Sequence, residues 1–256
     1  MKKSIFAFLL FLNSCAGAQD NSIIEDKNVV IRQVANFNEI QVRGPFTVHF
    51  SDGKNCDLAV SASEKSVRDM IVTNVVNGQL QISLGEKSWK VWQSNLKLKV
   101  YLSAPDIKKI TASGASDFIV HDILKSSNLD LVFSGASDFK GKIDAQLLTA
   151  NFSGASDLTI SGSVRDAKIR VSGASDFKGF SLNAENVEAT SSGASSIKIT
   201  AHKSIKAVAS GASDIEYKGN PGSISKSSSG ASSIVKKDCC SLGLLIDSTN
   251  LINSCC

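Results

Sequence analysis

The sequence predicts an all-β fold, a parallel β-solenoid with about 19 residues per coil. A hexapeptide, Ser-Gly-Ala-Ser-Asp/Ser-apolar, occurs seven times, and its glycines are spaced 21, 19, 19, 20, 18 and 19 residues apart. Between the copies run short stretches in which apolar and polar residues alternate, the pattern of β-strands. Helical repeats need about 33 residues or more, so a period this short favours the β-solenoid over them. The seven glycines are Gly114, Gly135, Gly154, Gly173, Gly193, Gly211 and Gly230.

Two positions of the hexapeptide indicate which residues face the interior. The third position is always alanine, which indicates a tight corner packed against interior side chains. Because a single repeat cannot bury its own apolar face, the coils are stable only as a stack. The last position is apolar in every copy and is expected to form a core column of Phe118, Phe139, Leu158, Phe177, Ile197, Ile215 and Ile234.

The N-terminus predicts export. Lys2 and Lys3 precede an apolar run over residues 5–12, which is too short to span a bilayer and has the form of a signal peptide. Residues 1–14 are expected to be removed, with Cys15 lipidated as in bacterial lipoproteins; cleavage by an ordinary signal peptidase at the small residues 16–18 is the alternative. This removal takes away two lysines and no acids, so the net charge falls from +4 to +2. So small a charge gives no support to nucleic-acid binding.

The rest of the chain divides into three parts. Residues 28–110 lack the hexapeptide and are predicted to form short strands, arranged as irregular coils or a cap over the first regular coil. Within them, an Asn77-Gly78 turn predicts an antiparallel hairpin, and the clearest strand is the alternating run that ends before Pro105. Residues 111–236 hold the seven repeats. Residues 237–256 are a cysteine-rich tail, expected to cover the last coil, whose open edge would otherwise pair with another chain.

The positions of the cysteines predict a C-terminal tail that is closed by disulfide bonds. In an oxidising compartment the adjacent pairs are expected to form disulfides, which leaves Cys56 unpaired and buried. A zinc site is the alternative, but adjacent cysteines lack the usual spacing of zinc ligands, so no metal site is expected. The cysteines of the tail are Cys239, Cys240, Cys255 and Cys256.

Stacking places the fifth position of the hexapeptide in one column, and five of its seven members are aspartates. The structural interpretation is that each carboxylate accepts hydrogen bonds from nearby backbone N–H groups, as in an Asx turn. The alternative is a ladder that binds a ligand or a cation such as Ca²⁺. Carboxylates ~4.8 Å apart repel by only ~0.9 kcal/mol in water, so the column needs no metal, and the interchange with serine favours the structural interpretation. The members are Asp117, Asp138, Asp157, Asp176 and Asp214, with Ser196 and Ser233 in the other two places.

Two further features allow a structural and a functional interpretation. The serine columns that begin at Ser113 and Ser116 either satisfy backbone groups at the corners or line an exposed polar stripe. Trp89 and Trp92 are candidates for a surface on which sugars stack, and they are equally suited to packing in a cap.

Catalytic groupings are sparse. The three histidines, His49, His121 and His202, are isolated from one another in the sequence and are expected to lie in different surroundings. Each repeat places the same residues in the same surroundings, whereas an active site needs one set of residues that differs from the rest. The chain is therefore predicted not to be an enzyme. The alternative is a polysaccharide-cleaving β-helix, which would combine carboxylates and basic residues on one face.

The pattern of the N-terminal half, together with the repeats, resembles a family of bacterial proteins. Phe37, Ile40, Val42, Gly44, Phe46 and Val48, the strand that ends at Pro105, and the Ser-Gly-Ala-Ser-Asp units are similar to the putative autotransporter adhesin, head GIN domain family over about residues 29–236. The resemblance implies an exported, often lipid-anchored, right-handed parallel β-helix with no catalytic residues. This chain has Ser-Gly-Ala-Ser where the family often has Ser-Gly-Ser-Gly, and its cysteine-rich tail is not part of the family pattern.

Export, repetition and the lack of a catalytic cluster together predict a non-enzymatic surface module of the bacterial cell envelope. The leading role is adhesion to a carbohydrate or a surface protein. The expected location is the outer membrane or cell surface, attached by a lipid anchor, with the periplasm as the alternative. A polysaccharide-acting enzyme and a purely structural envelope protein are the other candidates.

Overall fold

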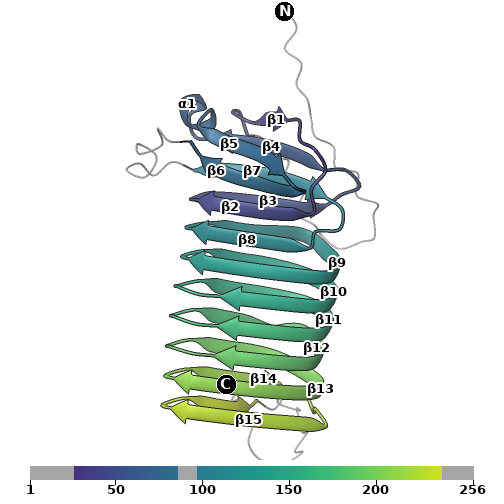
Figure 1. The fold of residues 1–256 in the computed structure, drawn as a ribbon, viewed down its shortest axis with the longest axis vertical. Helices are drawn as coiled ribbons and strands as arrows, with labels where there is room; N and C mark the ends of the chain where they lie inside the picture. The colour runs from purple at the N-terminus through teal and green to yellow at the C-terminus, as the bar shows by residue number, and fades with distance from the viewer. Residues whose placement is uncertain (1–25, 86–96, 238–256) are drawn as a thin grey trace, which may run out of the picture.

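The computed structural model describes residues 26–85 and 97–237, which form one elongated stack of β-coils (Figure 1). The N-terminal elements are β1 (Val30–Arg32), β2 (Glu39–Gly44), β3 (Phe46–Asp52), β4 (Asp57–Ala62), α1 (Lys65–Arg68), β5 (Ile71–Val76), β6 (Gln79–Leu84) and β7 (Leu98–Ala104). The repeats form β8 (Lys109–Gly114), β9 (Asp117–Gly135), β10 (Asp138–Phe152), β11 (Asp157–Val171), β12 (Asp176–Ser191), β13 (Ser196–Gly211), β14 (Asp214–Lys218), β15 (Ser223–Gly230) and β16 (Ser233–Lys236). The predicted parallel β-solenoid is confirmed.

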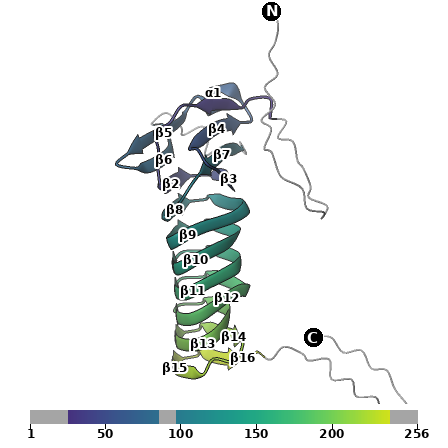
Figure 2. The ribbon, with the colours of Figure 1, turned by 90° about the vertical axis from the view of Figure 1, so that its right-hand side faces the viewer.

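The stack has two parallel-stranded faces joined by two corners, and Figure 2 shows it from the side. Each long strand from β9 to β13 contributes its first half to one face and its second half to the other. Face 1 contains β6, β2, β8, the second halves of the long strands, and β15. Face 2 contains β7, β3, the first halves, β14 and β16. The apolar residues between the two faces form the core.

The N-terminal coils are not stacked in chain order. The coil formed by β2 and β3 pairs with the first regular coil through β8 and β9. The later strands β6 and β7 pair with the other edges of β2 and β3, so they lie farther out (Figure 1). Along the chain, β2 and β3 form one coil, and β6 and β7 then form a second coil on its outer side. After β7 the chain crosses back to the inner side of the first coil, where β8 begins the repeats.

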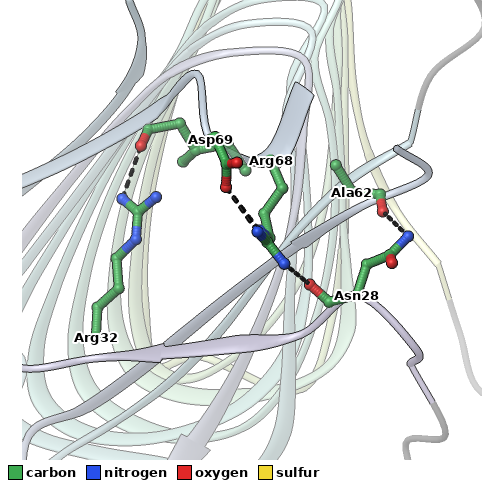
Figure 3. A network of polar contacts seen from close by, with 6 residues as sticks. Asn28, Arg32, Ala62, Arg68 and Asp69 are labelled. Carbon is green, nitrogen blue, oxygen red and sulfur yellow. Dashed lines mark hydrogen bonds and ion pairs between the residues drawn. The ribbon is translucent and has the colours of Figure 1, made fainter. Parts of the chain in front are cut away.

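Antiparallel strands and a polar network close the N-terminal end. β4 and β1 continue face 2, and β5 continues face 1 through the predicted Asn77-Gly78 hairpin with β6. Figure 3 shows how side chains join these elements. Arg32 donates to the carbonyl oxygen of Ile71 at 2.7 Å, and Arg68 donates to that of Asn28 at 3.1 Å. The Asn28 side chain in turn donates to the carbonyl oxygen of Ala62 at 3.0 Å, so β1, β4, α1 and β5 are tied together.

Glycine is required at the repeated corner by both conformation and space. Gly173 has φ of +80°, and a Cβ atom there would lie 2.5 Å from the carbonyl oxygen of Gly154 in the preceding coil. That carbonyl accepts a 2.8 Å hydrogen bond from the N–H of Ala174. Gly44 lies in register with Gly114 and also has positive φ, so an eighth corner precedes the seven that the hexapeptide identifies.

The interior of each corner is polar but satisfied. The second serine of the hexapeptide is buried in six of seven copies, as at Ser156. Its hydroxyl donates to the carbonyl oxygen of Ser153 at 3.2 Å, and its N–H donates to the hydroxyl of Ser175 in the next coil at 3.1 Å. The column that begins at Ser116 therefore serves the corner backbone and does not form an exposed stripe.

The predicted core column is buried down to Ile215. Phe118 and Phe139 lie in register with ring centroids 6.0 Å apart, and Phe118 lies 6.2 Å from Phe50 in the coil above. These contacts join the N-terminal coils to the repeats through a continuous aromatic stack.

The C-terminal coil ends the core with polar side chains. Every residue of β15 is exposed, and within the described residues this strand pairs only with β13. Lys226 takes the place that Ala207 has in the preceding coil, and its Nζ atom lies 4.8 Å from the centroid of the Tyr217 ring. An inward-pointing charge at a sheet edge disfavours the addition of another strand.

Candidate functional site

A shallow groove of about 530 Å³ crosses four coils at the start of face 1, just after the bend in the long strands. We call it the polar groove, and its floor includes the buried residues Ala167, Val187 and Ile205. Leu147 borders it at one end, on β10. Its polar lining consists of Asp166, Lys168, Asn186, Glu188, Ser204, Lys206, Ser223 and Ser225.

The lining residues stand in two columns because the coils stack in register. Asp166, Asn186, Ser204 and Ser223 occupy one column, on β11, β12, β13 and β15 in turn. Two residues further along each strand, Lys168, Glu188, Lys206 and Ser225 form the second. Side chains two apart on a strand point to the same side, so both columns face solvent together.

Hydrogen bonds between coils hold the first column in place. The Nδ2 atom of Asn186 donates to Oδ1 of Asp166 at 2.9 Å, and the hydroxyl of Ser204 donates to Oδ1 of Asn186 at 2.8 Å. Arg165 donates from Nε to Oδ2 of Asp166 at 2.9 Å. The hydrogen bonds from Asn186 and Arg165 lower the pKa of Asp166, so its carboxylate is ionised at neutral pH.

The aspartate column lies on face 2, away from the polar groove, and the register brings its members together as predicted. Asp157 binds Lys178, whose Nζ atom lies 2.6 Å from its Oδ2 atom. This hydrogen bond raises the pKa of Lys178, and the charges of Asp157, Asp176 and Asp138 raise it further. The backbone N–H of Asp157 donates to Asp138 at 3.0 Å. A lysine and backbone groups thus occupy positions near the middle of the column that a cation ladder would use.

The other members of this column have different partners. Burial raises the pKa of Asp117, and the charge of Asp138 contributes to the shift. Ser196 and Ser233 each donate to an aspartate of the coil before. Across residues 26–85 and 97–237, no three His, Cys, Asp or Glu side chains are grouped so as to hold a metal ion.

The prediction that the three histidines are isolated is wrong for two of them. Nδ1 of His49 lies 2.9 Å from Nε2 of His121, so one nitrogen donates and the other accepts. His49 also packs against the ring of Tyr101, with centroids 5.2 Å apart. The sequence could not show this, because β3, β7 and β9 are brought together by the unusual order of the N-terminal coils. His202 lies apart on β13, where it contacts Asn183.

Burial and nearby charges shift two groups in this cluster. Burial lowers the pKa of His49, and the charges of His121 and Lys99 lower it further. Burial, with the charge and hydrogen bond of Asp26, raises the pKa of Tyr101 to about 12. The cluster therefore contains a neutral His49 and a neutral Tyr101 at pH 7, with the carboxylate of Asp26 beside Tyr101.

Several sequence predictions fall outside the described residues. These are the lipidated Cys15, the sugar-stacking Trp89 and Trp92, and the disulfide-forming Cys239, Cys240, Cys255 and Cys256. Cys56 has a free thiol and is half-buried, and it accepts a hydrogen bond from the N–H of Phe37 at 3.5 Å.

The polar groove was missed because its residues do not repeat. Asp166, Asn186, Ser204 and Ser223 share a column but not a single residue type, so a search for identical positions passes over the column. Aligning the repeats on their glycines does not reveal the column, because Asp166 lies 12 residues after Gly154 whereas Asn186 lies 13 after Gly173.

Comparison with solved structures shows the same fold in several bacterial proteins. The first is a "putative adhesin" from Bacteroides fragilis, 25% identical, which matches 83% of this chain and 98% of its own with a TM-score of 0.75. A "putative lipid binding protein" from Parabacteroides distasonis is 23% identical, covers 82% and 97%, and has a TM-score of 0.65. A "putative adhesin" from Parabacteroides merdae is 15% identical, covers 82% and 95%, and has a TM-score of 0.64.

Three further findings bear on the identity of the chain. A search of curated proteins found no match. In the part of the chain that the structure describes, no helix is long and apolar enough to cross a membrane. A family model described as "Putative auto-transporter adhesin, head GIN domain" matches residues 36–221, and the chain therefore belongs to this head GIN domain family.

Proposed function

We propose that the protein is a non-enzymatic binding module of the bacterial cell envelope and that it acts as an adhesin. The observation that carries this proposal is the polar groove, a preordered surface formed by side chains from four stacked coils. Its volume of about 530 Å³ is in the range of ligand sites, about 300–1,000 Å³. The family and the similar Bacteroides fragilis structure, both described as adhesins, support the same role.

The chemistry of the groove favours binding over catalysis. A carboxyl that acts as a general acid at neutral pH needs a raised pKa. Asp166 has the opposite shift, because Asn186 and Arg165 hydrogen-bond to its ionised form. Asp117, whose pKa is raised, belongs to the aspartate column on face 2 and not to the groove. A polysaccharide-acting enzyme therefore remains the second candidate.

Binding is tested with the purified mature protein on an array of host and bacterial glycans and on immobilised surface proteins, with and without Ca²⁺. We expect saturable binding that does not need Ca²⁺. A protein that binds neither class would refute the adhesin role. Release of shortened products from a bound polysaccharide would establish the enzyme instead.

We further propose that a lipid on Cys15 attaches the protein to the envelope. The support is the cysteine placed directly after the apolar run of residues 5–12. Growth with a labelled fatty acid should label the wild-type protein, and Cys15→Ser should remove the label and release the protein from membranes. Equal labelling of both proteins would contradict the anchor.

A further inference from the structure

We infer that the polar groove binds a neutral glycan strand that runs along the solenoid axis; this inference rests on the adhesin function proposed above. The direction follows from the two columns, which cross the β-strands and run from coil to coil. Four coils at ~4.8 Å spacing give a contact length of ~14 Å. A linear oligosaccharide of a few rings fits such a site better than a single sugar does.

The first column offers both donors and acceptors to the ligand. Asn186 uses one of its two N–H groups on Asp166 and one acceptor position on Ser204, so a donor and an acceptor remain. Asp166 is acceptor-only, and Ser204 can still accept. Sugar hydroxyls donate and accept at once, and they match this mixed set. Because the hydrogen bonds between coils already fix these side chains, little conformational entropy is lost on binding.

The second column explains why the ligand is neutral. Lys168, Glu188 and Lys206 alternate in sign from coil to coil, and all three are exposed. A charged polymer is steered by a surface of one sign, and alternating charges cancel that field at a distance. Each charged group can still hydrogen-bond a hydroxyl close by.

The lining is less suited to a protein ligand. The residues that dominate protein interfaces are Trp, Tyr and Arg held in central pockets, and the groove is lined by none of these. The backbone groups of β11 to β13 along the groove pair with neighbouring coils, so a bound peptide could not add to the sheet there. Leu147, half-buried at one end, gives an apolar contact for the C–H face of a sugar ring.

The test is titration calorimetry on the full mature protein with neutral hexasaccharides of β-glucan, xylan and mannan, and with charged oligogalacturonate. We expect at least one neutral hexasaccharide to bind and Asn186→Ala to weaken it at least tenfold. Ser204→Ala should weaken it less, since Asn186 keeps its bond to Asp166. The matched control is Asn151→Ala, because Asn151 is also half-exposed on face 1 but lies outside the groove, and we expect less than a twofold change. Thermal unfolding of each variant shows that the fold is retained.

Three results would overturn this inference. One is binding of oligogalacturonate alone, with strong salt dependence. Another is an equal loss in Asn186→Ala and Asn151→Ala. The third is failure of every neutral glycan while the protein still adheres to immobilised proteins, in which case the adhesin function stands with a different ligand. Failure on both glycans and proteins would overturn the adhesin function itself.

Discussion

The hydroxyl of Ser196 donates a 2.6 Å hydrogen bond to the carboxylate of Asp176, which lies one coil before it in the same column. Ser233 makes the same 2.6 Å bond to Asp214. Both serines in the column therefore follow an aspartate, and each supplies a donor where another aspartate would add a like charge. The interchange of Asp and Ser in the repeat has a physical basis in this pairing.

The Ser196–Asp176 bond predicts a modest effect on stability. Ser196→Ala should lower the free energy of unfolding by ~1 kcal/mol, because it removes a charge-assisted bond that is half-exposed. Urea denaturation measures the change. Ser181→Ala, at an exposed position on β12, is the control and should change stability by less than ~0.5 kcal/mol. Equal changes in the free energy of unfolding for Ser196→Ala and Ser181→Ala would show that the Ser196–Asp176 hydrogen bond does not stabilise the fold.

Substitution of a corner glycine is expected to lower the free energy of unfolding much more than Ser196→Ala does. Gly173→Ala should cost more than ~2 kcal/mol, because alanine is strained at φ of +80° and its Cβ would meet the Gly154 carbonyl oxygen. Gly222→Ala is the control: no positive φ is found there, and the nearest atom to an added Cβ is 3.9 Å away. Denaturant unfolding should leave this second variant close to wild type. A small cost at Gly173 would refute the tight corner.

The lowered pKa of His49 predicts loss of stability in acid. The unfolded chain takes up a proton near pH ~6.5, whereas folded His49 takes it up only at a lower pH. This contribution is therefore complete above pH ~6.5 and is lost as the pH falls through the folded-state pKa. Melting temperatures from pH 7.5 to 5 should fall less steeply in His49→Gln than in wild type. Ser181→Ala, which removes no titratable group, should keep the wild-type slope, and a wild-type slope in His49→Gln would contradict the assignment.

The position of Lys226 leads to a prediction about the outer edge of β15. Lys226→Ile should promote self-association, because it replaces an inward charge with an apolar residue in β15, which among the described residues pairs only with β13. Light scattering against protein concentration measures this. Lys168→Ile, an equal change at an exposed position on β11, is the control for added surface hydrophobicity. A monomeric Lys226→Ile protein would show that the lysine does not protect the edge.

The repeats could be predicted from sequence because each coil repeats one environment, so identical residues mark identical positions. The corner at Gly44 was less visible because Pro45 and Phe46 stand where later coils have alanine and serine. The placement of β6 and β7 outside β2 and β3 could not be predicted, since adjacent coils in the chain are normally adjacent in space. The His49–His121 contact depends on that placement.

The polar groove lay beyond sequence reasoning for a different reason. Its column is defined by alignment across coils, and the bulges between Thr159 and Ser161 and between Gly179 and Asn183 shift that alignment. Only the three-dimensional structure shows that Asp166 and Asn186 are neighbours.

The central claim is that the protein holds its ligand without changing it. The most direct measurement is to load the immobilised protein with the glycan that it binds, elute the glycan after prolonged contact, and determine its chain length by mass spectrometry. We predict full recovery at the original length from wild type, and loss of retention with Asn186→Ala. Shortened chains in the eluate would contradict the claim and establish a polysaccharide-cleaving enzyme.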